Sequence, residues 1–387
     1  MPSWRASNSV WTKETIPLKH VAFLPVLPHP ATDYNSIYSQ MKNFVEVCSQ
    51  LNQDKFPIYC DEKVYAIAKE IQLQCPQEFS CLFLCLGTFH CVKNLLKCNG
   101  KSLEGSGAEL VWLNAGVHGP SVIEKSILHA THYSCALEAQ SQLAEATRRL
   151  QYKEFFKVHK LSDYSAEINI LQKLKDSVAN GNIADSQIYL EEFRQTSQKL
   201  STDLDSFIRV QSAKNENFKF WSQFLNRYDV AVDLIRADHE GLWDLHLDAT
   251  QRSLYEYTAW SSTNYIRWAS VYLEEARNLK DTAPVIYENF KKGSFAIKDH
   301  PGRFIAVGGD QKLEQTINAS SKSCDAVIGH SKQKQFIAEW NLIYHEMLSV
   351  NNLFRDYTGI KDNTSEAYLH HESSPSFTKR SESHVQA

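Results

Sequence analysis

The first part of the chain alternates between apolar runs and helical periods. The runs Val21–Leu27, Phe56–Cys60 and Ser80–Leu86 have the length and composition of buried strands. Between them, Ser36–Leu51 and Val64–Ile71 carry apolar residues at helical spacing. This β-α-β order predicts an α/β core, in which parallel neighbouring strands require right-handed crossovers.

The middle of the chain carries helical periods and almost no strand signal. We expect long helices over Ala136–Lys160, Ala184–Val210 and Asn217–Asp238, because these stretches are rich in good helix formers and keep a helical period. Further along, the pattern predicts short strands at Phe295–Lys298 and Arg303–Val307, and helices at Gln311–Ser321 and Lys334–Asn352.

These patterns divide the chain into five segments. They are an irregular N-terminus (1–19), the first part of an α/β core (20–109), a helical insertion or lobe (110–292), the last part of the core with the final helices (293–360), and a tail rich in Ser, His and charge that we expect to be disordered (361–387).

Composition and charge narrow the classes of function. The 387 residues are 43% hydrophobic and carry a formal net charge of −4, which gives no overall attraction for nucleic-acid phosphates. The chain contains no apolar run of about 18 residues and no secretory signal. We therefore expect an intracellular protein, nuclear or cytoplasmic, that does not enter a membrane.

The cysteines admit two interpretations. Cys81, Cys85, Cys91 and Cys98 cluster in sequence around His90, so a zinc site has to be considered. The spacing does not form two C-x-x-C pairs, however, and Cys81 and Cys85 lie in an apolar run. The pattern therefore favours buried thiols over metal ligands.

Two polar residues follow predicted strands. Asp61 comes directly after Phe56–Cys60, and His90 opens a helix just after Ser80–Leu86 and the turn at Gly87. Sites in open α/β sheets lie at the carboxyl ends of the strands. We therefore expect Asp61 and His90 at one edge of a sheet.

The residues around Asp61 and His90 resemble known motifs. The sequence D-E-x-x-x-A followed by L-C-L-G-T-F-H-x-x-K-N is similar to the middle of a Mutator-like transposase catalytic domain. Over roughly residues 20 to 360, the chain more closely resembles a family of uncharacterised, mobile-element-derived proteins of invertebrates and fishes. The blocks that carry this resemblance are Cys60-Asp61-Glu62 with Tyr65, Leu86 to His90, Gly100 with Gly105-Ser106-Gly107, Trp243 to Leu247, and Gly309 to Gln315.

The resemblance implies an RNase H-like α/β core with a large all-helical insertion. It also implies a two-metal site for DNA strand transfer or cleavage, with Mg²⁺ as the cofactor. In that site Asp61 would be the second carboxylate, Glu314 the third and Asp310 a nearby alternative, with His90 near the metals or the scissile phosphate. The structural alternative is that Asp310 caps a helix and that His90 forms a hydrogen bond with nearby backbone. Glu314 would then be a surface residue, or a residue of the first helical turn, where the helix dipole stabilises a negative charge.

The first carboxylate of such a site is missing. Before Asp33 the chain has one acidic residue, Glu14, and its surroundings do not resemble a buried strand. We therefore expect a core that lacks its opening strands, and a transposon-derived protein that is degenerate or incomplete as an enzyme. The alternative function is a non-catalytic helical scaffold for protein interactions. If the metal site is kept, the Asp61 and Glu314 carboxylates should lie within about 10 Å of each other.

DNA, a partner protein and a second copy of the chain are the candidate partners. The local basic stretch consists of Arg148, Arg149, Lys153, Lys157 and Lys160, interleaved with Tyr152, Phe155 and Phe156. It is either a DNA-binding surface or an ordinary charged helix face over a packed aromatic stripe.

Overall fold

The computed structural model describes residues 16–21 and 29–316, together with Asn8, Thr12, Asn318 and isolated positions between 339 and 357. Most of the predicted strand at Val21–Leu27, the predicted helix Lys334–Asn352 and the tail 361–387 lie outside these residues. Of the described residues, 73% are helical and 4% are in strands.

The prediction of an RNase H-like α/β core is wrong for the described residues. They contain one sheet with two parallel strands, in a fold that is otherwise helical. The predicted strands Phe295–Lys298 and Arg303–Val307 form only isolated bridge positions, at Ile297 and Val307. Strand formation requires a partner in space, which a local apolar run does not supply.

The chain separates into two compact units. The sheet unit comprises residues 18–91, 267–289 and 307–387, and the helical unit comprises residues 1–17, 92–266 and 290–306.

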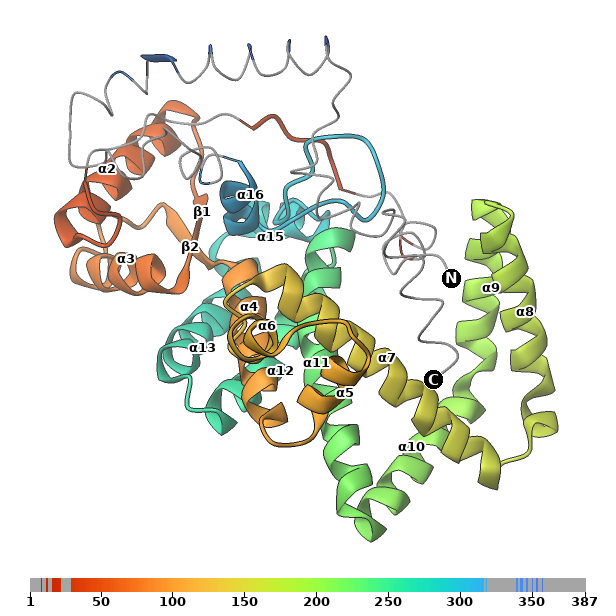
Figure 1. The fold of residues 1–387 in the computed structure, drawn as a ribbon. Coiled ribbons are helices and arrows are strands. Elements are labelled where there is room, and N and C mark those ends of the chain that lie inside the picture. Colours follow the sequence, from red (N-terminus) through yellow and green to blue (C-terminus); the bar gives the residue numbers. More distant parts are fainter. Residues whose placement is uncertain are drawn as a thin grey trace. The chain divides into compact units, whose positions relative to one another are not determined.

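The sheet unit contains both strands (Figure 1). Its elements are α2 (Tyr34–Gln50), β1 (Phe56–Cys60), α3 (Glu62–Gln74), β2 (Leu82–Leu86), the first residues of α4 (Thr88–Leu103), most of α13 (Thr263–Arg277), α14 (Leu279–Thr282), most of α15 (Pro284–Lys291) and α16 (Gly309–Gln315).

The register of the two strands pairs Phe56 with Leu82 and Cys60 with Leu86. The backbone N–H of Phe56 donates to Cys81, on the β2 side. Because successive residues of a strand point their N–H groups to opposite sides, Pro57 faces away from β2, where its missing N–H leaves no unpaired donor. β1 therefore has the sequence of an edge strand.

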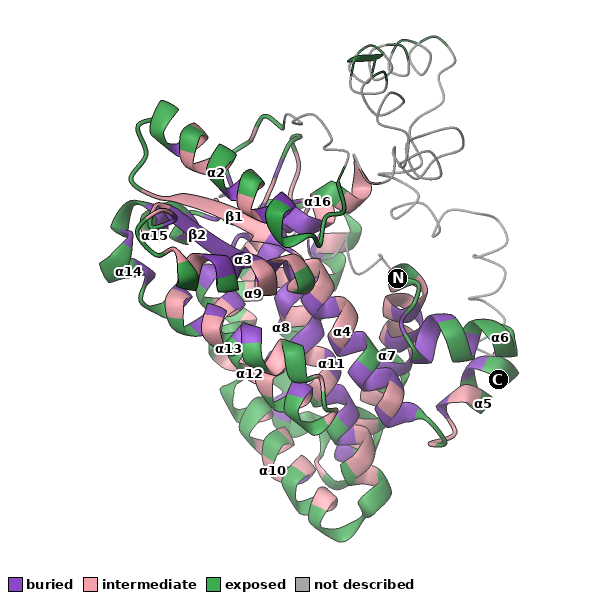
Figure 2. Cartoon of the chain, turned by 90° about the vertical axis from the view of Figure 1, so that its left-hand side faces the viewer, coloured by how far each residue is buried: buried purple, intermediate pink, exposed green. Residues whose placement is uncertain are grey.

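A small aromatic core lies against the sheet. Every residue of β2 is buried (Figure 2). Tyr65 and Ile71 of α3 are fully buried, and the Tyr65 ring makes edge contacts with Trp268 and Tyr272 of α13. The helical period that predicted α3 comprises Val64, Ile67, Ala68 and Ile71, of which Ala68 and Ile71 are buried, whereas Tyr65 lies outside that pattern.

The helical unit contains the remaining elements. They are the rest of α4, α5 (Ala108–Asn114), α6 (Pro120–Val122), the π-helix η1 (Ile123–Leu128), α7 (Tyr133–Val158), the 3₁₀ turn η2 (Leu161–Tyr164), α8 (Ser165–Ala179), α9 (Ile183–Thr196), α10 (Gln198–Lys214), α11 (Glu216–Glu240), α12 (Trp243–Ala259) and the start of α13.

Two hydrophobic clusters hold this unit together. The larger one includes Trp112, Ile127 and Phe224, and the smaller one is built from Phe155, Tyr164 and Phe207. No described helix is apolar enough over a sufficient length to cross a membrane.

Candidate functional site

The site begins at the end of β1, where Asp61 starts α3. Its Oδ1 accepts a hydrogen bond from the backbone N–H of Val64 at 2.8 Å, so Asp61 is the N-cap of α3. The N–H of Gly87 donates to the Cys60 carbonyl at 2.7 Å and holds the ends of the two strands together. The candidate metal ligand Asp61 thus already has a structural role.

His90 lies in the first turn of α4, just after β2, and contacts Asp310 of α16. The His90 Nδ1 is 3.0 Å from Asp310 Oδ2, and the same carboxylate accepts from the backbone N–H groups of Phe89 at 3.3 Å and His90 at 3.1 Å. The first N–H groups of a helix have no partner within the helix. Asp310 therefore caps α4, an element some 220 positions earlier in the chain.

Two glycines allow this close packing. A Cβ on Gly87 would lie 2.8 Å from the Cβ of Asp310, and a Cβ on Gly309 would lie 2.8 Å from the Tyr59 ring. Either side chain would overlap with its neighbour, since such separations are below normal contact distance. Gly87 and Gly309 thus let α16 approach the strand ends closely.

The electrostatics of the site show which charges surround His90. Burial acts to lower the His90 pKa, but the hydrogen bond to Asp310 and the charges of Asp310, Asp61 and Glu314 outweigh it, so the pKa is raised. Nearby, the pKa of the Cys60 thiol is raised to about 12, first by burial and then by the charges of Asp61 and Asp310. The charges of all three candidate carboxylates therefore act on His90, and Asp310 contacts it directly. The separation of the Asp61 and Glu314 carboxylates stays a prediction.

The arrangement of the side chains does not fit a metal ion. Both oxygens of Asp310 already accept hydrogen bonds, and Asp310 is buried. Glu314 accepts a hydrogen bond from Asn318 at 3.2 Å. Within the described part of the chain, no group of three His, Cys, Asp or Glu side chains could hold a metal ion. The Mg²⁺ cofactor stays a prediction.

The cysteines near His90 behave mainly as core residues. Cys85, Cys91 and Cys98 are buried, whereas Cys81 is half-buried. The described residues contain no cysteine-based metal group either. The buried-thiol interpretation thus agrees with the structure at three of the four positions.

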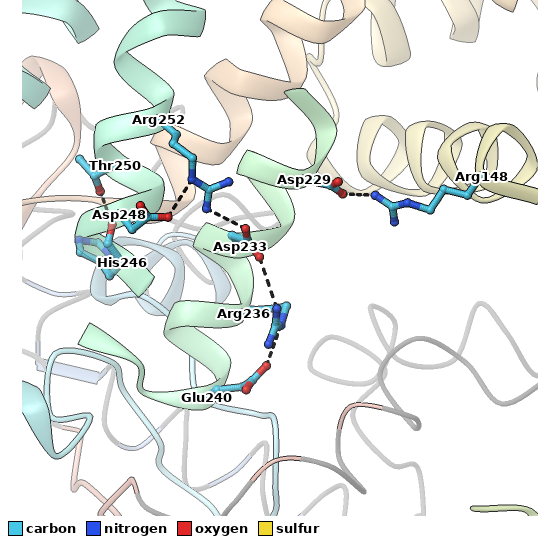
Figure 3. Close-up of polar contacts among 9 residues, drawn as sticks. All are labelled: Arg148, Asp229, Asp233, Arg236, Glu240, His246, Asp248, Thr250 and Arg252. Atoms are coloured by element: carbon cyan, nitrogen blue, oxygen red, sulfur yellow. Dashed lines mark hydrogen bonds and ion pairs between the residues drawn. The ribbon is translucent and has the colours of Figure 1, made fainter. Parts of the chain in front are cut away.

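His246, in the Trp243–Leu247 block, is a core residue of the helical unit. Burial lowers its pKa to about 4, so the imidazole is neutral near neutral pH. Its ring stacks on Trp243 with centroids 5.2 Å apart. Its backbone carbonyl accepts from Thr250 in the next turn of α12 (Figure 3).

An ion-pair network that the sequence analysis missed lies beside His246. Arg252 of α12 reaches both Asp248 and Asp233 at 2.8 Å, and Arg236 joins Asp233 to Glu240 (Figure 3). The (i, i+4) pairs could have been found from charge spacing. The ion pair between Arg252 and Asp233 joins α12 to α11, so charge spacing along one helix could not have predicted it.

The basic stretch of α7 is largely paired. Arg148 forms an ion pair with Asp229 of α11, and Arg149 and Lys157 pair with acidic residues on α7 itself, at 2.8 and 2.6 Å (Figure 3 shows the Arg148 pair). Phe155 is fully buried in the smaller cluster. These contacts favour the second interpretation, in which the stretch is an ordinary charged helix face that covers a packed aromatic stripe, and not a DNA-binding surface.

Comparison with known proteins places the chain in a family. The model of the family described as "Domain of unknown function (DUF8702)" matches residues 3–387, so the chain belongs to that family. No curated protein and no solved structure matches this chain.

Proposed function

We propose that this chain is a mobile-element-derived, non-catalytic protein in which the acidic edge of an ancestral DNA strand-transfer enzyme serves as a structural junction. Its mobile-element ancestry is supported by the order of the motifs and by the charges of Asp61, Asp310 and Glu314, all of which raise the His90 pKa. Its lack of activity is supported by one observation: the Asp310 carboxylate accepts hydrogen bonds from three donors of α4.

Metal binding would have to compete with these bonds. A Mg²⁺ ion needs carboxylate lone pairs in near-octahedral geometry and gives up its waters reluctantly. Turning Asp310 towards a metal would remove the acceptor of the part-buried N–H groups of Phe89 and His90, at a cost of up to about 1–3 kcal/mol for each group. A bound metal would therefore have to offset the loss of these bonds.

Two measurements on the full chain test this proposal. Thermal unfolding is followed in EDTA, in Mg²⁺ and in Mn²⁺, and nicking of supercoiled plasmid is followed in the same solutions. We expect no shift in melting temperature with either metal and no metal-dependent nicking, because bound ligand would stabilise the folded state.

The variants are Asp61→Asn and Glu314→Gln, with Glu70→Gln as the matched control, since Glu70 is an exposed residue of α3. Metal-dependent nicking that Asp61→Asn abolishes and Glu70→Gln retains would show that the chain is an enzyme and refute the proposal.

A second candidate function, a scaffold that assembles through its own copies, is favoured by the surface of α5. Leu110, Val111 and Leu113 are 60%, 51% and 42% exposed, whereas Trp112 between them is buried. Exposed apolar groups gathered on one short helix are typical of contact surfaces. A second copy of the chain is the simplest partner, because a two-fold contact uses the same surface twice.

Light scattering after size exclusion tests this function. We expect a dimer that the double variant Leu110→Ser with Val111→Ser converts to monomer. The control Leu73→Ser changes an equally exposed leucine on α3 and should leave the dimer intact. A wild-type chain that stays monomeric at all concentrations refutes self-association.

A further inference from the structure

The helix α4 is mostly buried, and its narrow solvent-facing strip consists mainly of lysines. Between positions 91 and 103, every residue is buried except Lys93, Asn94, Lys97 and Lys101. Lys97 is exposed, and the other two lysines are half-buried. All three lie in the part of α4 that belongs to the helical unit. An exposed helix face that serves only solubility usually mixes both signs of charge, so three lysines and no acid on this strip call for an explanation.

The three lysines form a row along one face of α4. Each follows the previous one by four residues. Because an α-helix rises about 1.5 Å per residue, successive lysines are about 6 Å apart along the helix axis and share one side of it. Like charges four residues apart destabilise a helix slightly. The row is therefore unfavourable for the helix alone.

The lysine row has no acidic partner in the part of the chain that the structure describes. The Lys101 ammonium donates to the Trp260 carbonyl at 3.5 Å, and none of the three lysines forms an ion pair with a described residue. Two carboxylates border this surface. Glu104 follows Lys101 by three residues, and the charge of Glu256 of α12 acts on Arg227 of α11. Three ammonium groups are thus left for an external anion.

We propose that the lysine row of α4 (Lys93, Lys97 and Lys101) binds an acidic peptide segment in extended conformation, with Asp or Glu at every second position. Side chains on one side of an extended strand are two residues apart, which is about 6.6 Å at about 3.3 Å per residue. That repeat matches the spacing of about 6 Å in the row. Three carboxylates can therefore face three ammonium groups, and such complementary charges fix the register of a partner.

An extended peptide fits this strip better than duplex DNA or a helix does. Duplex DNA carries one charge per roughly 1.7 Å, which is far denser than the row. Its excess phosphates would meet the chain's net charge of −4 and the bordering Glu104 and Glu256. A helix with its side chains is about 10–12 Å wide, whereas the strip exposes a single row. The row shares no residue with the junction around His90, so its binding does not depend on the proposed function.

The test is fluorescence anisotropy of two labelled peptides titrated with the full chain at about 0.05 M salt. One peptide repeats the dipeptide Glu-Ser four times, and the other has the same composition with its four glutamates in one block. We expect the alternating peptide to bind about threefold more tightly, because the block cannot place a third carboxylate on the same side of the strand. Both peptides should bind more weakly as the salt concentration rises.

Variants show whether the position of the lysines matters. The triple variant of the row, Lys93→Gln with Lys97→Gln and Lys101→Gln, should bind the alternating peptide about tenfold more weakly. The matched control changes the net charge equally at three exposed positions of the helical unit and should bind as the wild type does. It combines Lys153→Gln, Lys175→Gln and Lys214→Gln.

Four outcomes would refute the proposal. They are no binding of either peptide, equal binding of the two peptides to the wild type, equal loss in the two triple variants, and tighter binding of a labelled oligodeoxythymidine that depends on the row. The third outcome would mean that net charge alone attracts the peptide, and the fourth would assign the row to nucleic acid. The two wild-type titrations decide the matter even if the row variant fails to fold.

Discussion

Asp310 is the residue on which the junction around His90 depends. Its carboxylate accepts from two backbone N–H groups of α4 and contacts the His90 ring, while it is only 5% exposed. Asp310→Asn keeps the size of the side chain but replaces one acceptor with an N–H₂ group that faces donors. We expect the free energy of unfolding to fall by about 1–3 kcal/mol, measured by chemical denaturation.

The control for this change is Asp281→Asn, since Asp281 is an exposed residue of α14 in the same unit. The free energy of unfolding of this control should stay within about 0.5 kcal/mol of that of the wild type. Equal stability of Asp310→Asn and the wild type would mean that the cap does not hold α16 on α4.

The raised pKa of His90 predicts how stability depends on pH. The folded state binds the His90 proton more tightly than the unfolded state does, because Asp310, Asp61 and Glu314 outweigh the effect of burial. The stabilisation is therefore fully present below the unfolded pKa of about 6.5 and is lost as the pH rises through the raised folded pKa.

We expect the wild type to lose more free energy of unfolding than His90→Gln does between about pH 6 and about pH 8, measured by urea denaturation. If the free energy of unfolding changes with pH in the same way in both proteins, the His90 proton does not contribute to stability. Asp310→Asn should reduce the difference between them, because it removes the strongest favourable partner.

At the scale of elements, α4 passes unusually close to η1. A Cβ on Gly100 of α4 would lie within 2.6 Å of the carbonyl carbon of Leu128, which ends the π-helix. Backbone cannot move aside as a flexible side chain does. Gly100→Ala should therefore lower the free energy of unfolding by about 1–3 kcal/mol in a denaturant titration.

Gly119→Ala is the matched control for Gly100→Ala. Gly119 has an ordinary φ of −77° and open space where a Cβ would lie. The control should be neutral or slightly stabilising, because alanine restricts the unfolded chain. If both variants lose the same stability, the contact between α4 and η1 is not tight.

Elements were predictable from sequence where the pattern is local. The strand Phe56–Cys60 was predicted with the observed bounds, since charge follows it directly. The single helix predicted over Ala184–Val210 is wrong, because α9 ends at Thr196 and α10 begins at Gln198. No glycine or proline marks that break.

The candidate site was predictable only in part, for a similar reason. The position of Asp61 was predictable because this residue comes directly after a strand. The hydrogen bond from α4 to Asp310 was not predictable, because it joins residues 220 positions apart. The two-strand sheet shows the same limit, because the number of strands depends on partners far along the chain.

At the scale of the whole molecule, charge bears on the proposed DNA partner. The chain carries a net charge of −4, and three of the five basic residues in the α7 stretch form ion pairs, including Arg148 with Asp229 of α11. Few cations of this stretch are therefore left to displace counterions from DNA, and counterion release provides most of the affinity in non-specific binding.

We expect fluorescence anisotropy of a labelled DNA duplex to stay flat as the chain is added at about 0.15 M salt. Lowering the salt should produce at most weak binding, which Lys153→Glu leaves unchanged. Lys153 and Lys160 are the exposed residues of the stretch for which no ion pair is described, and of the two only Lys153 lies within α7. Tight binding that weakens steeply with salt and with Lys153→Glu would contradict this expectation and assign α7 to DNA. Such a result would leave the proposal that the chain does not cleave DNA untouched, because a protein can bind DNA through phosphate contacts without cutting it.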